Sequence, residues 1–153
     1  MSSVQTYTLV LNTTAKNVIS TDTCHTVVTF SINWSTFLPM DCTKYSCSYV
    51  FKGGVYTGAL AANGIVFANF GKTDSYVDGS TPSSYLGMIT PIIIGNYSFF
   101  NSTNNDNNPV TIYPCNNLIT ITLKQFDNAT LLTDTQAHLS NYILSLTLTP
   151  IYD

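Results

Sequence analysis

Two segments near the C-terminus alternate apolar and polar residues so regularly that they can only be strands. The first is "NNLITITLKQF", in which Ile119, Ile121 and Leu123 fall on one face. The second is "NYILSLTLTPI", and its apolar face is formed by Tyr142, Leu144, Leu146 and Leu148. A period of two residues is that of a strand with one buried face. Such strands must pair, so the chain has to fold around a sheet.

The rest of the chain has the composition of strands and turns. It contains 23 Thr, 10 Tyr and 8 Phe, together with 15 Asn and 15 Ser. All five basic residues are Lys and all eight acidic residues are Asp, so the good helix formers Arg and Glu are absent. At 153 residues the chain is the size of one domain. We therefore predict a single all-β domain over residues 1–153.

Turn signals divide the chain into eight predicted strands. The intervals are Val4–Asn12, His25–Trp34, Thr43–Lys52, Gly64–Phe70, Tyr85–Ile94, Val110–Tyr113, Asn117–Phe126 and Asn141–Thr149. Pro91 makes the fifth an edge strand or one that breaks at a bulge, and residues 132–140 could form a short helical turn.

Eight strands in about 150 residues favour a single jelly roll, an eight-stranded Greek-key β-sandwich whose first and last strands lie close together. An immunoglobulin-like sandwich is the alternative, but Cys24, Trp34 and Cys42 are too closely spaced for it.

Charged residues are 8% of the chain, against about 25% in typical domains. Either Thr, Ser and Asn keep the protein soluble, or neighbouring molecules cover much of its surface. The net charge of −3 and the lack of Arg argue against nucleic acid as a partner. The N-terminus does not resemble a secretory signal, and no apolar run is long enough for a transmembrane segment. We expect synthesis in the cytoplasm.

No pattern predicts catalysis, a cofactor or a metal site. Cys24, Cys42, Cys47 and Cys115 lack zinc-site spacing, and without a secretory signal thiols are favoured over disulfides. His25 and His138 are isolated histidines, and we expect no enzyme activity. Calcium would need the loops with Asp74, Asp78 and Asp106 to converge, although Asp is also an ordinary turn residue. We therefore expect no metal.

One predicted loop combines aromatic and amide side chains, within "NYSFFNSTNNDNNP". Its candidate contact residues are Tyr97, Phe99, Phe100, Asn101 and Asn104. Exposed aromatics beside Asn are typical of sugar-binding sites, and they are equally typical of a loop that docks on another protein. A third alternative is that the loop folds its aromatic side chains back over the edge of the sheet.

The order of several segments resembles a known family. "FSINWSTFLP" is followed by "TKYSCSYVF", "SSYLGMITP", "DNNPVTIYPCNNLITITLKQFDNATLL" and "NYILSLTLTPI". This order, over roughly residues 4–151, resembles the single-jelly-roll minor capsid and penton proteins of large icosahedral double-stranded DNA viruses of the algal-virus, iridovirus and giant-virus groups. The chain departs from the family where Asp127-Asn128 replaces the Asp-Gly turn that often follows the penultimate strand. The family has no catalytic residues to transfer.

The resemblance implies a structural virion protein that is made in the host cytoplasm and assembles into an icosahedral capsid. Its expected partners are other capsid proteins, including the major capsid protein and copies of itself. Neutral surfaces suit assembly because burying an unpaired charge is costly. The alternative function is a carbohydrate-binding β-sandwich, either lectin-like or the head of a fibre.

Overall fold

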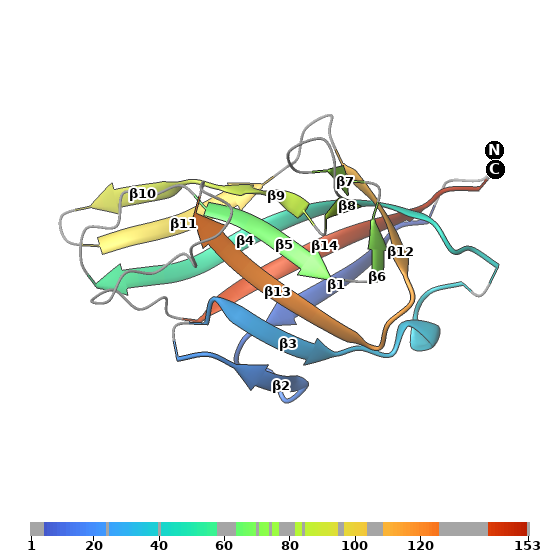
Figure 1. Cartoon of the computed structure of the whole chain (residues 1–153), viewed down its shortest axis with the longest axis horizontal. Coiled ribbons are helices and arrows are strands. Elements are labelled where there is room, and N and C mark those ends of the chain that lie inside the picture. Colours follow the sequence, from blue (N-terminus) through green and yellow to red (C-terminus); the bar gives the residue numbers. More distant parts are fainter. Residues whose placement is uncertain are drawn as a thin grey trace.

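The computed structural model is all-β, as predicted (Figure 1). It describes residues 5–23, 25–39, 41–57, 64–69, 71–73, 75–76, 82–83, 85–94, 97–103, 109–125 and 141–152. The strands there are β1 (Tyr7–Asn12), β2 (Val18–Thr21), β3 (Val27–Ser31), β4 (Tyr45–Thr57), β5 (Gly64–Asn69), β6 (Gly71–Thr73), β7 (Ser75–Tyr76), β8 (Pro82–Ser83), β9 (Tyr85–Ile89), β10 (Pro91–Ile94), β11 (Tyr97–Thr103), β12 (Val110–Pro114), β13 (Leu118–Gln125) and β14 (Tyr142–Pro150). One 3-10 turn, η1 (Trp34–Thr36), follows β3.

The strands form two large antiparallel sheets. Sheet A has the order β1-β14-β4-β11-β10, and β12 pairs with both β4 and β6. Sheet B has the order β2-β3-β13-β5-β9, while β7 and β8 form a separate pair. The first and last strands are hydrogen-bonded neighbours, with Tyr7 opposite Leu148 and Leu11 opposite Leu144. This confirms the expected proximity of the terminal strands, and Figure 1 shows the start of β1 and the end of β14 at the same end of the molecule.

Most predicted strands are found with shifted ends. The break expected near Pro91 is confirmed, because β9 ends at Ile89 and β10 starts at Pro91. The short β2 was not predicted, and the segment His25–Trp34 is a strand only over Val27–Ser31. The predicted loop after residue 95 is wrong in its first half, because Tyr97–Thr103 is strand β11. The helical turn expected within residues 132–140 lies outside the described residues.

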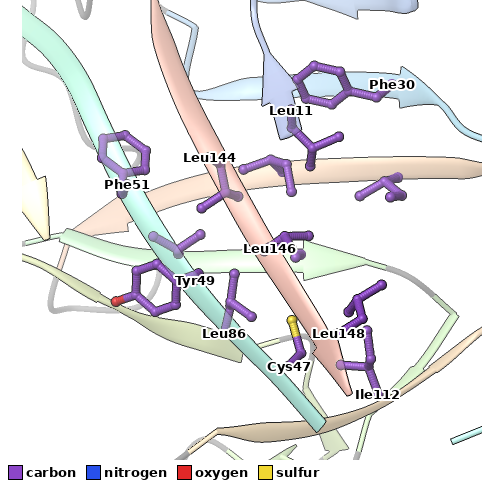
Figure 2. Packing of buried hydrophobic residues seen from close by; sticks show 14 of the residues in the cluster. Leu11, Phe30, Cys47, Tyr49, Phe51, Leu86, Ile112, Leu144, Leu146 and Leu148 are labelled. Atoms are coloured by element: carbon purple, nitrogen blue, oxygen red, sulfur yellow. The ribbon is translucent and has the colours of Figure 1, made fainter. Parts of the chain in front are cut away.

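Alternation along the strands decides which side chains are buried. The even-numbered residues from Tyr142 to Leu148 are at most 1% exposed, and Ile119, Ile121 and Leu123 are completely buried. β4 contributes its odd-numbered residues from Tyr45 to Phe51 to the same core cluster. Figure 2 shows Phe51, Tyr49 and Cys47 of β4 beside Leu144, Leu146 and Leu148 of β14. The two sheets therefore share one apolar core, and the inner faces of β13 and β14 are those that the sequence predicts.

One close contact between the sheets joins Tyr49 of β4 to Gly87 of β9. The Tyr49 ring lies over Gly87, and its hydroxyl donates to the backbone carbonyl of Met88. A Cβ built on Gly87 would lie 2.6 Å from Oη and 2.7 Å from Cζ of Tyr49. Only glycine leaves room for the ring here.

Two further contacts fix the ends of the core. Phe51 stacks on Tyr142 with ring centroids 4.8 Å apart. At the other end, the Trp34 indole N–H donates to the carbonyl of Asn116 over 2.6 Å, which ties η1 to the start of β13.

The hairpin of β2 and β3 is organised by one carboxylate. Asp22 accepts hydrogen bonds from the backbone N–H groups of Thr26 and Val27, at 2.7 and 3.0 Å, and from the Thr26 hydroxyl. His25 adopts φ 57° in the turn, and its N–H donates to the Asp22 carbonyl over 3.2 Å. The buried Thr26 is satisfied by this network, which holds β3 in register with β2.

Candidate interaction surface

Most of the residues that the sequence predicts as a contact loop lie in a strand. Tyr97, Phe99, Phe100 and Asn101 lie along β11, which pairs with β4 on one side and β10 on the other. Asn104 lies outside the described residues. The part that these five residues play in contacts stays a prediction.

Most of the other groups considered for chemistry are not among the described residues. Asp74, Asp78, Asp106 and His138 lie outside the described residues, as does Cys24. Across the part of the chain that is described, no three His, Cys, Asp or Glu side chains are grouped so that they could hold a metal ion.

The buried ionisable groups belong to the core. Cys42 and Cys47 are buried free thiols, whereas Cys115 is exposed. Burial raises the pKa of the Cys47 thiol to about 12, which keeps it protonated and unreactive at neutral pH. Burial is also the main reason that the pKa of Tyr49 rises to about 12, with a contribution from Tyr85. Burial likewise raises the pKa of Tyr142.

The outward face of sheet A has a uniform character across β1, β14 and β4. We call it the outer face of sheet A, and it comprises Thr8, Val10, Asn12, Ser46, Ser48, Val50, Lys52, Ile143, Ser145, Thr147 and Thr149. One of these side chains carries a charge, namely Lys52. The other members are hydroxyl, amide or aliphatic groups, as alternation in the sequence predicts for the last strand.

The aliphatic members of this face are close to one another. Val10, Ser145 and Val50 form one row across the three strands, because Ser145 lies opposite both valines. Ile143 lies two positions along β14, in the row formed by Asn12 and Lys52. The exposed fractions are 54% for Val10, 42% for Ile143 and 36% for Val50. The middle of the outer face is therefore an uncharged patch of β-branched side chains.

A shallow hollow lies at one end of this patch. It is lined by Asn12, Lys52, Gly53, Asn141, Tyr142 and Ile143. Gly53 has φ 104°, a conformation that favours glycine, and a Cβ built there would lie 2.9 Å from the carbonyl oxygen of Asn141. At the same position the pairing of β4 with β11 shifts register. Glycine is thus required by a bulge.

Fold and surface together define an all-β protein of two antiparallel sheets with an almost uncharged outer face. Among the described residues, no helix is long and apolar enough to cross a membrane. Neither a protein-family model, nor a curated protein, nor a solved structure matches this chain.

Proposed function

We propose that this protein is a structural virion protein, a minor capsid or penton subunit that assembles with other capsid proteins into an icosahedral shell. The order of strands in the two sheets is the observation that carries the proposal. Since one fold can serve many functions, the character of the surface has to support the proposal as well.

The strand order supports a jelly roll because the main strands pair as nested partners. In chain order these strands are β1, β3, β4, β5, β9, β11, β13 and β14. The first pairs with the last, the second with the seventh, the third with the sixth and the fourth with the fifth. These nested pairs form one long antiparallel hairpin. Two more pairings, of β14 with β4 and of β13 with β5, join its strands into two sheets. Jelly rolls are built from two Greek keys of this kind and occur in viral capsids and in lectins.

The outer face of sheet A supports the capsid function over catalysis. A subunit in a shell must bury surface against neighbours, and burying charge without a partner is costly. Eleven outward side chains with Lys52 as their one charge can be covered with little electrostatic loss. The proposed partners are the major capsid protein and copies of this chain, and the proposed location is the virion.

The test is the composition of purified particles from infected cells that make this chain. We expect stepwise disruption of the particles to release the chain with shell proteins and not with the genome or internal contents, as followed by peptide mass spectrometry. An abundant chain in infected cells that is missing from the particles would exclude the proposal. A glycan array run on the purified chain tests the alternative, since specific sugar binding would favour a lectin-like module.

The mass of the purified assembly distinguishes the two positions in a shell. A penton closes a five-fold ring through one heterologous contact repeated around the axis, so it should be a pentamer. A minor capsid protein forms no five-fold ring, so it need not be a pentamer. Native mass spectrometry separates these outcomes.

A further inference from the structure

The outward edge of β1 carries backbone groups that point away from its one described neighbour, β14. The N–H of Thr13 donates to the Tyr142 carbonyl over 3.2 Å, in the register in which Tyr7 lies opposite Leu148. On the far side of β14, the N–H of Ile151 donates to the Lys44 carbonyl over 2.9 Å. Hydrogen bonding alternates along an antiparallel strand. Both bonds therefore require that the backbone N–H and C=O groups of the odd-numbered residues of β1 point toward β14. The N–H and C=O groups of Thr8 and Val10 then point outward, away from β14.

The side chains of β1 also leave apolar surface at this edge. Val10 is 54% exposed on the outer face, while Tyr7 and Leu9 pack against the core but stay partly exposed. Their counterparts on the adjacent strand, Leu146 and Leu148, are completely buried. The core is therefore less fully covered at β1, and Figure 1 shows the strand beside β14 along one margin of sheet A.

Other described edge strands carry features that discourage pairing with another molecule. β10 begins with Pro91, β6 has three residues, and β2 and β9 both have register shifts in their pairing. Proline, short length and bulges are common means of protecting an edge. β1 has six residues, an unbroken register, no charge and no proline. This combination is typical of an edge that accepts another strand.

We propose that β1 pairs in antiparallel fashion with β1 of a second copy of this chain, centred on Leu9. In this register, Thr8 exchanges two hydrogen bonds with Val10 of the partner subunit, and the two-fold axis repeats them. Leu9 then lies opposite Leu9 of the partner subunit, and Tyr7 opposite Leu11 of the partner subunit, so the partly exposed inner side chains cover each other. A second copy is the occupant because the strand is uncharged and complementary to itself, which is what a two-fold contact requires.

The contact joins the two A sheets edge to edge into one continuous sheet. Two six-residue strands bury less than the roughly 1,200 Å² at the low end of stable interfaces, so we expect a weak dimer that depends on concentration. The inference rests on the β1 backbone and not on the proposed function. A two-fold dimer would favour the minor capsid position over a penton.

The first experiment removes one outward N–H without disturbing the bonds to β14. Thr8→Pro does this, because proline is tolerated in an edge strand where its missing N–H faces solvent. Thr8→Val is the matched control, since it keeps the N–H. Sedimentation velocity from about 1 µM to about 1 mM should show a dimer for the wild type and Thr8→Val. For Thr8→Pro the Kd should rise at least about tenfold, with circular dichroism unchanged. Equal association of all three chains, or no dimer for any, would overturn the proposal.

The second experiment tests the register and does not depend on the proline variant folding. Residues facing each other outside the hydrogen-bonded pairs have Cα atoms about 4.5 Å apart, which is within disulfide range. Leu9→Cys should therefore form a dimer under mild oxidation, and peptide mass spectrometry should locate the link at residue 9. Val10→Cys is the control, because its two copies would lie diagonally, about 7–8 Å apart. Linkage at residue 10 in place of residue 9, or at neither, would overturn the proposal.

Discussion

Replacing Gly87 by alanine places two opposing effects in competition. Removing a glycine usually stabilises a protein by about 0.4–1 kcal/mol, because the unfolded chain loses freedom. Here the added methyl group would lie 2.6 Å from Oη and 2.7 Å from Cζ of Tyr49. The ring is 3% exposed, and its hydroxyl is bonded to the Met88 carbonyl, so it cannot move aside without losing packing and that bond.

Overpacking of a core costs about 1–3 kcal/mol, and loss of the hydrogen bond adds about 0.5–1.5 kcal/mol. The steric effect should therefore win, and we expect Gly87→Ala to lower the free energy of unfolding by about 0.5–4 kcal/mol after the entropic gain is subtracted. For a chain of this length, each kcal/mol lowers Tm by about 2–4 °C. Urea unfolding followed by circular dichroism gives the free energy directly.

A double-mutant cycle tests the stated cause. In a Tyr49→Leu background the ring is gone, so Gly87→Ala should become neutral or slightly stabilising. A reversal of sign between the two backgrounds is the expected result. If Gly87→Ala is equally destabilising with and without the Tyr49 ring, the contact between the sheets is not the reason for glycine at this position.

Three further predictions concern polar groups that are buried or partly buried. Tyr142→Phe should be neutral or stabilise the protein by up to about 1 kcal/mol, because the buried hydroxyl has no hydrogen-bond partner among the described residues. Tyr49→Phe loses the hydrogen bond to Met88, so it should lower the free energy of unfolding by about 0.5–1.5 kcal/mol in the same urea assay. A loss on Tyr142→Phe as large as that on Tyr49→Phe would contradict this. Asp22→Ala should cost at least about 2 kcal/mol, because three donors lose their acceptor; a change below about 0.5 kcal/mol would refute its role in the hairpin. The raised pKa of Cys47, about 12 against an ordinary 9.0, means that the native state keeps a proton that the unfolded state releases. The contribution of the Cys47 thiol to the free energy of unfolding is therefore complete below pH 9 and is lost as the pH rises toward 12. Cys47→Ala should make the free energy of unfolding fall less steeply between pH 8.5 and 10.

Much of the fold could be predicted because alternation decides which face of a strand is buried. The core residues of β3, β4, β13 and β14 follow from sequence, since a shift of one residue would expose an entire apolar face. The pairing of the terminal strands also follows once a jelly roll is assumed.

β11 could not be predicted in the same way. Its sequence "YSFFNST" joins aromatic residues to turn formers and runs into an asparagine-rich segment, which is typical of a loop. Two neighbours override that local preference, because β4 and β10 pair with it on both sides. Whether a strand lies in the middle or at an edge depends on the order of the sheet. For this reason the character of β1 as an edge could not be found from sequence alone.

The nested pairing of strands also dictates the order in which the chain can close. β5 and β9, the innermost pair, lie near each other in sequence, whereas β1 must find β14 at the opposite end of the chain. Closing a longer loop costs more chain entropy, and folds dominated by distant contacts form slowly. We therefore expect the inner strand pairs to form first and β1 to pair with β14 last. A chain still emerging from the ribosome would lack β14, and so the strand that we propose for self-association would meet its own sheet only after β14 has been synthesised.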